Sequence, residues 1–329
     1  MKTLVITGAS GFIGLNIVER FLSEGWRVRA LSIDGIPELA RSEFARLPGS
    51  LDDRRGDVRD RAALEALFEG GSVDAVVAAA AITSGPDRER ARPADVFEVN
   101  LVAPMRLLEI ASARGVPRML CFSSTSSMGE LPFGGKPVME TDVPQPLTLY
   151  GASKAALETA GKRWNGLGAL PRVFVARLTA AVGPWERDTG VRDTLSPPLA
   201  IVESALAGEA VAPLPEGGWR DYAYAPEVAA QIHWLLTADS PAPAHTLYQL
   251  SPGFTWHASE MIGALREAGI EPKFSDTGRV VAFNDDLTRR RSPLSAARIS
   301  EEFRKPPAAA DCARDYVRWA LAHRGWFTR

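Results

Sequence analysis

The stretch "TLVITGASGFIGLNIVERFLSEG", residues 3–25, decides the fold of this 329-residue chain. It opens with five β-prone residues, "TLVIT", of the kind that a strand buried on both faces requires. Three glycines at a spacing of three follow, and apolar residues at helical spacing come after them. A strand, a glycine turn and a helix in this order are typical of a dinucleotide-binding unit, which predicts a parallel α/β sheet.

The glycine turn predicts the place of the pyrophosphate. A phosphate reaches the backbone amides of a helix N-terminus only if no Cβ atom stands in its way. We therefore expect the turn and the first helical residues to bind a dinucleotide: Gly8, Gly11, Phe12, Ile13 and Gly14. The spacing GxxGxxG differs from the more usual GxGxxG.

The second expected strand, "RVRALSID" at 27–34, should deliver an acidic residue to the adenosine ribose. Asp34 lies twenty residues after the last glycine of the turn, and its carboxylate would accept hydrogen bonds from the ribose and repel an extra phosphate. This favours NAD. Ser32 is the alternative ribose contact; it would not repel a phosphate, and Arg29 or Arg41 would then assist NADP.

Strand and helix patterns alternate through the first half of the chain. After the first unit come a short strand ending in "RRGDVRD" (54–60), the helix "RAALEALF", the strand "VDAVVAAAA", a helix over 93–113 and the strand "RMLCFSS". This alternation predicts a doubly wound parallel sheet, a Rossmann fold, with ligands at the carboxyl ends of its strands. We expect a dinucleotide-binding domain over 1–183 and a smaller substrate-binding lobe mainly over 184–329, with part of 226–260 returning to the first domain.

The pentapeptide "YGASK" places a phenol and an ammonium four residues apart. On a helix, Tyr150 and Lys154 share one face and can reach one point. A phenol titrates near pH 10, and a neighbouring cation lowers its pKa. The pair suits proton transfer, although an ordinary solvated helix start has the same spacing.

Eight motifs in chain order resemble the extended short-chain dehydrogenase/reductase family of NAD-dependent epimerases and dehydratases. They are "TGASGFIG", "GDVRD" with Asp57 and Val58, "AAAA" with Ala79 and Ala80, "FEVNL" with Asn100, "FSSTSSMG", "YGASK", "ARLTAAVGP" with Arg177, and "WRDYAY" with Arg220. The match extends over nearly the whole chain.

The resemblance implies a role for each matched residue. Tyr150 would move the hydroxyl proton, Lys154 would lower its pKa and hold the nicotinamide ribose, Ser124 would bind the substrate oxygen, and Asn100 would steady Lys154 through water. Asp57 and Val58 would contact the adenine, while Ala79, Ala80 and Arg177 would line the rest of the cofactor site. Thr125 and Ser126, which are alternatives to Ser124 if the register slips, would contact the substrate together with Arg220.

Departures from the family pattern narrow the chemistry. Met128 stands where many members have a tyrosine, and Thr125 and Ser126 stand where the dehydratases carry acids, which disfavours dehydration. Ala180 replaces an asparagine that often helps to bind sugar diphosphates. We expect hydride transfer at a secondary alcohol of a sugar, a sugar acid or a nucleotide sugar. An epimerase that retains its NAD and a non-enzymatic dinucleotide-binding redox sensor are the alternatives.

Composition limits the partners. The net charge of −2 gives no broad basic footprint for nucleic acid, and the apolar run at 75–82 is too short to span a bilayer. The four histidines and two cysteines show no metal-ligand spacing, so no metal is expected. We expect a cytoplasmic homodimer that acts on a small molecule.

Overall fold

The computed structural model describes residues 1–83, 85–188, 196–240, 242–281 and 289–327. Its centre is a seven-stranded sheet in the order β11-β6-β5-β4-β1-β2-β3, and all neighbouring strands in it are parallel. The strands are β1 (Thr3–Thr7), β2 (Arg27–Ser32), β3 (Ser50–Arg55), β4 (Ala75–Ala78), β5 (Arg118–Ser124), β6 (Arg172–Leu178) and β11 (Leu247–Leu250). The expected doubly wound sheet is confirmed.

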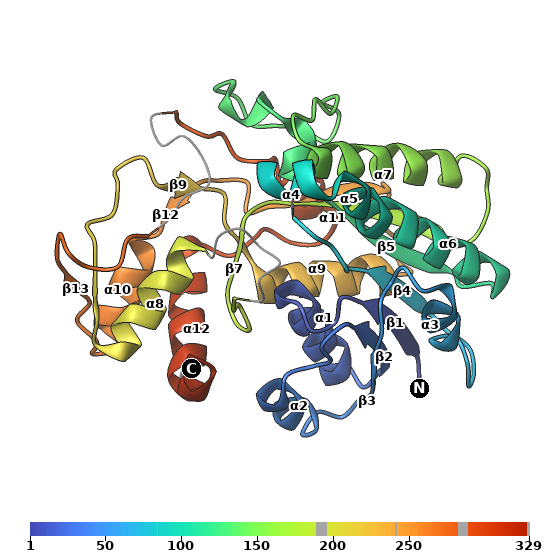
Figure 1. The fold of residues 1–329 in the computed structure, drawn as a ribbon, viewed down its shortest axis with the longest axis horizontal. Coiled ribbons are helices and arrows are strands. Elements are labelled where there is room, and N and C mark those ends of the chain that lie inside the picture. The colour runs from blue at the N-terminus through green and yellow to red at the C-terminus, as the bar shows by residue number, and fades with distance from the viewer. Residues whose placement is uncertain (84, 189–195, 241, 282–288, 328–329) are drawn as a thin grey trace.

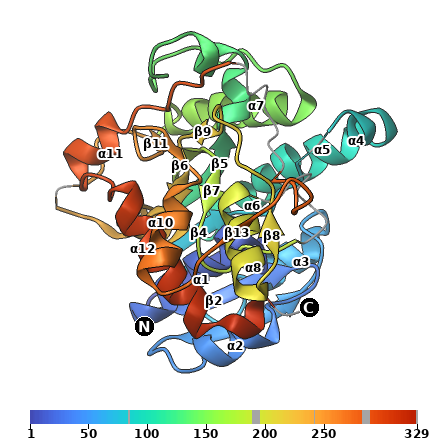
Figure 2. The ribbon, with the colours of Figure 1, turned by 90° about the vertical axis from the view of Figure 1, so that its left-hand side faces the viewer.

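Helices cover both faces of this sheet (Figures 1 and 2). One face packs on α1 (Phe12–Ser23), α2 (Glu38–Phe44) and α9 (Ala225–Thr237), and the other on α3 (Arg61–Ala66), α6 (Ala103–Ala113) and α7 (Leu149–Asn165). Strand alternation produces these two cores: Leu4 and Ile6 pack on the α1 face, and Val5 packs on the opposite face.

The helix expected over 93–113 is divided in the structure. It consists of α5 (Pro93–Phe97), one π-helical segment η1 (Glu98–Val102) and α6, and the short α4 (Pro86–Ala91) precedes it. Between β5 and α7 the chain is mostly irregular and contains two 3₁₀ turns, η2 (Thr125–Met128) and η3 (Leu131–Phe133).

The smaller lobe lies beside the carboxyl ends of the strands, at the left in Figure 1. It contains α8 (Pro197–Ala207), α10 (Glu260–Glu267), α12 (Ala309–Ala322), η4 (Arg324–Trp326) and three two-stranded pairs: β7 (Ala181–Val182) with β10 (Ala223–Tyr224), β8 (Ala210–Val211) with β13 (Lys273–Phe274), and β9 (Trp219–Arg220) with β12 (Trp256–His257). From the segment 226–260, most of α9 and all of β11 belong to the large sheet and its cover; α11 (Ala297–Glu302) also packs there.

An aromatic cluster joins the two units. Trp185 is fully buried at a positive φ of 68°, and its ring meets those of Trp319 and Trp326 edge to face. Its Nε1 donates to Glu19 of α1 at 2.7 Å, and burial raises the pKa of that carboxyl. The connection between the units is therefore a packed joint beside the glycine turn.

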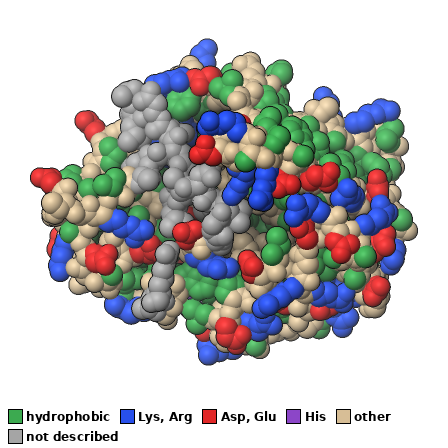
Figure 3. Space-filling model, in the orientation of Figure 1, with side chains coloured by type: hydrophobic (Ala, Val, Ile, Leu, Met, Phe, Trp, Pro, Cys, Tyr) green, Lys and Arg blue, Asp and Glu red, His purple; other side chains and the backbone are tan. Residues whose placement is uncertain are grey.

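Basic and acidic side chains intermingle over the face shown in Figure 3. In the part of the chain that the structure describes, no helix is both long enough and apolar enough to cross a membrane. Nor do the described His, Cys, Asp and Glu residues gather in any group of three or more that could hold a metal ion.

Candidate active site

The three glycines of the turn differ in what a Cβ atom at each position would contact. Gly8 has a φ of 71°, and a Cβ there would lie 2.5 Å from the Ala80 nitrogen; a Cβ at Gly14 would collide with the Gly8 carbonyl oxygen. The fold itself requires glycine at both positions. Gly11 has an ordinary φ of −75°, and a Cβ there would meet only the Gly8 oxygen, at 3.3 Å. Protein packing alone does not explain glycine at this position.

The start of α1 suits an anion. Gly11 is the N-cap and supplies no side-chain hydrogen bond to the first turn of the helix. The helix dipole adds partial positive charge at the same point. A dinucleotide pyrophosphate therefore fits this turn, with Gly11 allowing its close approach.

The end of β2 differs from the simplest sequence expectation. Ser32 is the last residue of the strand and is 5% exposed, and its Oγ has no hydrogen-bond partner. Asp34 lies two residues beyond the strand, exposed to solvent. Its contact with the ribose stays a prediction.

Arg29 is not available as a phosphate partner, which corrects the sequence-based alternative. Its guanidinium is buried on the α3 face and donates to the carbonyl oxygens of Leu67 and Gly70 at 3.2 and 2.8 Å. Strand alternation turns its side chain away from the α1 face. Arg41, the other alternative, donates to the carboxylate of Asp53 at 2.7 Å.

The other expected cofactor residues surround the same sheet edge. The Ala79 amide donates to Thr7 at the end of β1, and the Gly8 amide donates to Leu31 of β2, so the turn is tied to both neighbouring strands. Val58 is buried, and the Asp57 carboxylate pairs with Arg59 at 2.6 Å, which lowers the pKa of Asp57. Their contacts with the adenine stay predictions.

The first turn of α7 carries Tyr150 and is held from two sides. Thr148 caps it by accepting from the Gly151 amide at 3.0 Å, and Glu89 of α4 accepts from the Leu149 amide at 2.7 Å. A Cβ on Gly151 would collide with the carbonyl oxygen of Ser126. The glycine of "YGASK" thus lets the helix start press directly against the serine turn after β5.

Lys154 is buried on the same helix. Its side chain is 3% exposed, and its Nζ lies 5.5 Å from the centre of the Tyr150 ring. Burial lowers its pKa to about 8. The adjacent Cys121 supplies no counter-charge, because burial raises the pKa of its thiol to about 12. The Lys154 ammonium therefore lies close enough to Tyr150 to act on its phenol.

The hydroxyls after β5 are not equivalent. Ser124 Oγ accepts from the Ser126 amide at 3.2 Å and lies 3.4 Å from the Ser126 hydroxyl. Thr125 is buried, and its hydroxyl is engaged as a donor to the Leu178 carbonyl at 3.3 Å. This arrangement favours Ser124 over Thr125 as the hydroxyl that faces the substrate.

The buried carboxylate of Glu158 connects several segments of the site, and this residue was not identified from the sequence. Its Oε1 accepts from Ser123 at 2.5 Å, from Ser127 at 3.0 Å and from the Arg177 Nε at 2.8 Å, while its Oε2 accepts from the Arg177 Nη2 at 2.7 Å. Ser127 also donates to the Ser124 carbonyl at 2.8 Å. The available signal was the spacing: Glu158 follows Lys154 by four residues, on the same helical face.

Arg177, expected at the cofactor, and Asn100, expected near Lys154, both form hydrogen bonds with other parts of the protein. Arg177 is 1% exposed, forms the ion pair with Glu158 and donates to the Met139 carbonyl at 3.3 Å. The side-chain amide of Asn100 binds both the N–H and the C=O of Ile82, at 3.1 and 2.9 Å. Their roles toward cofactor and lysine remain untested predictions.

In the smaller lobe, the "WRDYAY" segment is mostly internal. Tyr222 and Tyr224 pack in the lobe core, and Arg220 is buried with its Nη1 donating to the Trp219 carbonyl at 2.6 Å. The substrate contact of Arg220 stays a prediction. Met128 stands where many members of the family have a tyrosine. It packs with Val138 and anchors the loop after β5.

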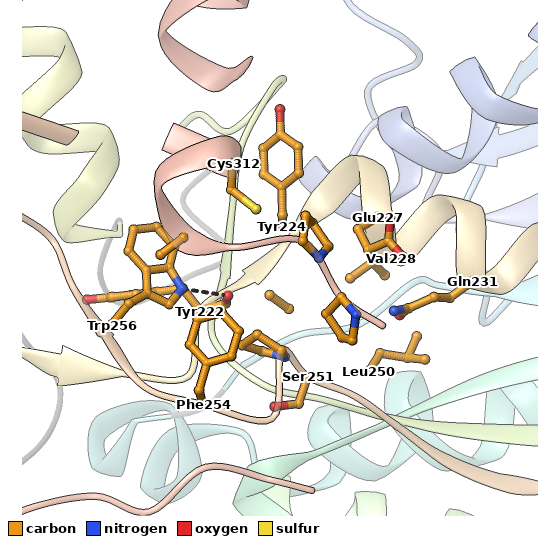
Figure 4. A pocket seen from close by; sticks show the side chains of 15 residues that line it. Tyr222, Tyr224, Glu227, Val228, Gln231, Leu250, Ser251, Phe254, Trp256 and Cys312 are labelled. Carbon is orange, nitrogen blue, oxygen red and sulfur yellow. Dashed lines mark hydrogen bonds between the residues drawn. The ribbon is translucent and has the colours of Figure 1, made fainter. Parts of the chain in front are cut away.

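Figure 4 shows a cavity that is lined by residues of this lobe, of α9 and of β11, and that is separate from the predicted catalytic residues. It is lined in part by Tyr222, Gln231, Phe254, Trp256 and Cys312, and Trp256 donates to the Tyr222 carbonyl at 3.0 Å. Its volume is about 10 Å³, which is room for one water molecule at most. None of Ser124, Tyr150 and Lys154 lines it, so we do not assign the substrate there.

The ion pair beneath the site gives a stability prediction. Glu158→Gln keeps the shape of the side chain but leaves the Arg177 guanidinium buried without its counter-charge. We expect the free energy of unfolding in urea to fall by about 3 kcal/mol. The double variant Glu158→Gln with Arg177→Met should regain most of that loss. A loss below about 1 kcal/mol in the single variant would contradict the structural role given to this pair.

Comparison with known proteins agrees with this geometry. Residues 4–250 match the family model of the NAD dependent epimerase/dehydratase family. A UDP-glucose 4-epimerase of Streptomyces lividans is 26% identical over 340 residues, which cover 97% of this chain and 96% of that protein. Sterol demethylase protein B of Methylococcus capsulatus is 32% identical over 188 residues, which cover 56% of this chain and 53% of that protein.

Among solved structures, the Thermus thermophilus UDP-glucose 4-epimerase in complex with NAD is similar, with a TM-score of 0.74 and 25% identity over 98% of this chain and 99% of that one. The family match spans well over half of the chain, and the fold agrees with it. The chain therefore belongs to the NAD dependent epimerase/dehydratase family, and it is an enzyme of the extended short-chain dehydrogenase/reductase type.

Proposed function

We propose that this enzyme transfers hydride between NAD and a secondary alcohol of a sugar, a sugar acid or a nucleotide sugar. The observation that carries the proposal is the Lys154 ammonium, buried beside Tyr150 on a helix that presses against the Ser124 turn. Burying a lysine without a paired carboxylate is unfavourable, and catalytic use explains why it is kept. A non-enzymatic sensor would have no need of a proton relay through Tyr150, Lys154 and Ser124.

The chain's own groups divide the work of the reaction. NAD, when bound, supplies the hydride acceptor. Tyr150 takes the proton from the substrate hydroxyl, and the Lys154 ammonium favours the phenolate that can do so near neutral pH. Ser124 Oγ donates to the same substrate oxygen and stabilises the charge that develops on it. The turn around Gly11 would hold the pyrophosphate of the dinucleotide, and the Lys154 ammonium would hold its nicotinamide ribose.

A nucleotide sugar is the substrate class that the relatives favour. The Streptomyces lividans and Thermus thermophilus proteins are UDP-glucose 4-epimerases, and this supports an epimerase that retains its NAD as the second candidate. Sterol demethylase protein B is 32% identical over about half of this chain, but its name indicates a different reaction. Relatedness alone therefore does not identify the substrate. Thr125 and Ser126 supply no carboxyl acid after Ser124, which argues against dehydration. The cytoplasmic location and the homodimer remain predictions.

A substrate screen tests the proposed activity. The protein is mixed with NAD and with polyols, aldonates, uronates or nucleotide sugars, and the absorbance band of the reduced nicotinamide is followed while products are separated by chromatography. Accumulating reduced cofactor indicates a dehydrogenase, and an isomeric sugar without net reduction indicates an epimerase. Neither product from any class of substrate would contradict the proposal.

The first variant tests proton transfer. Tyr150→Phe removes the phenolic hydroxyl and keeps the ring beside Lys154, so we expect unchanged folding and dinucleotide affinity. Turnover should fall by about 10²- to 10⁴-fold. Steady-state kinetics and calorimetric titration of the cofactor measure the two effects separately. Turnover near that of the unchanged enzyme would remove Tyr150 from the mechanism.

A second variant tests the cofactor turn. Gly11→Val should abolish dinucleotide binding but leave thermal stability nearly unchanged, because only the Gly8 oxygen approaches its Cβ position. Gly14→Ala is the matched comparison: its Cβ would collide with backbone, so it should lower the melting temperature. Calorimetry and thermal unfolding give the two readouts. Native affinity in Gly11→Val would show that the turn does not bind the pyrophosphate.

The buried lysine gives a pH prediction. Burial disfavours the charged form, so in the cofactor-free enzyme Lys154 should lose its proton near pH 8, below the value of about 10.4 for a free lysine. Between these two values the unfolded chain binds more protons, so stability should rise with pH there. NMR titration of ¹³C-labelled methylated lysines, assigned with Lys154→Met, measures this directly. A Lys154 signal that titrates above pH 10 would contradict the burial argument.

A further inference from the structure

Within the described residues, the hydroxyl of Ser32 has no hydrogen-bond partner. Ser32 lies at the edge of the sheet where we expect the adenosine half of a dinucleotide to bind. Ser32 is the last residue of β2. It follows Leu31, whose carbonyl accepts a hydrogen bond from the Gly8 amide of the glycine turn at 2.8 Å. The Ser32 side chain is about nineteen-twentieths buried, and its Oγ has no hydrogen-bond partner among the residues that the structure describes. A buried hydroxyl rarely stays unsatisfied, so an outside acceptor or donor is the natural partner.

Arg55 supplies a cation at the same place. It ends β3 and is paired with Ser32 in the parallel register of β2 and β3, so both side chains project from the same face of the sheet. Arg55 is exposed and forms no hydrogen bond or ion pair within the described residues. Its Nε lies 3.1 Å from the Cβ position of Gly35, in the loop that follows β2.

Among the arginines that the structure describes near this loop, Arg55 alone forms no side-chain hydrogen bond or ion pair. Arg41 is bound to Asp53, and Arg29 is buried on the opposite face of the sheet. Asp34 is the acidic residue nearest to Ser32 in the chain, but its charge acts on Arg187, which lies over the glycine turn and donates to the Ser10 carbonyl at 3.4 Å. The repulsion that Asp34 would exert on a phosphate is thereby offset.

We propose that Ser32 and Arg55 form a binding site for the 2′-phosphate of NADP, so that this enzyme accepts NADP as well as NAD. The Ser32 hydroxyl donates to a phosphate oxygen, and the Arg55 guanidinium forms charge-assisted hydrogen bonds with the others. A carboxylate at the end of β2 would repel that phosphate, and this chain has a hydroxyl there instead. The inference rests on the dinucleotide site of the proposed function.

Calorimetric titration of NAD and NADP into four proteins tests it without any need for the substrate. The unchanged enzyme should bind NADP with a Kd no more than about tenfold above that for NAD. Arg55→Gln should weaken NADP about 10- to 100-fold, the range expected for a charge-assisted hydrogen bond, and should change NAD less than about threefold. Ser32→Asp should weaken NADP at least as much, by repulsion. Arg41→Gln, the matched control at an arginine of α2 that is already paired with Asp53, should leave both affinities unchanged.

The outcomes separate this inference from the proposed function. Binding of NAD with NADP more than about 100-fold weaker would overturn the 2′-phosphate site and leave the proposed function standing. An unchanged NADP affinity in Arg55→Gln, or an equal loss in Arg41→Gln, would also overturn it. Failure of the unchanged enzyme to bind either dinucleotide would contradict the proposed function itself. Thermal unfolding of each variant excludes loss of fold as the cause of weak binding.

Discussion

The carboxylate of Glu158 is the constraint on which the arrangement of the catalytic groups depends. It accepts hydrogen bonds from Ser123 at the end of β5, from Ser127 in the following turn and from Arg177 of β6, while it belongs to α7 itself. Three separate segments therefore meet on one side chain. The turn that carries Ser124 cannot move independently of the helix that carries Tyr150 and Lys154. Such a fully satisfied buried network fixes geometry before substrate arrives, as electrostatic catalysis requires.

Against this rigid support, the enzyme keeps one group in an unfavourable state. Glu158 and Arg177 neutralise each other, but Lys154, one helical turn before Glu158, is buried next to a neutral thiol. Burial lowers the pKa of Lys154, which means that the folded protein destabilises the charged form of this side chain. A buried cation beside a phenol favours loss of the phenolic proton, so the same unfavourable burial serves Tyr150. Local rules are commonly broken at functional sites, and the packing around them holds the strained group in place.

The sequence predicted the order of strands and helices well, because strand runs, glycine turns and helical periodicity are local patterns. The spacing of Tyr150 and Lys154 also predicted that the two residues share one face of a helix, as they do on α7. It did not predict which face of a strand each charged residue would take. Arg29 turned out to bind carbonyls on the α3 face, and Arg177 turned out to pair with Glu158, because these outcomes depend on register and on partners far away in the chain. The close approach of Gly151 to Ser126 likewise exists only after the loop before α7 has folded back.

The central claim is that hydride moves between the substrate carbon and a nicotinamide held beside Tyr150 and Lys154. The most direct measurement starts from the enzyme saturated with NAD and a substrate that carries deuterium at the reacting carbon. The reaction is quenched early, and the cofactor is analysed by mass spectrometry. The account predicts that reduced cofactor bearing one deuterium appears in the unchanged enzyme. Product formed within a single turnover without labelled reduced cofactor at any quench time would contradict it, because hydride would then not pass through the nicotinamide.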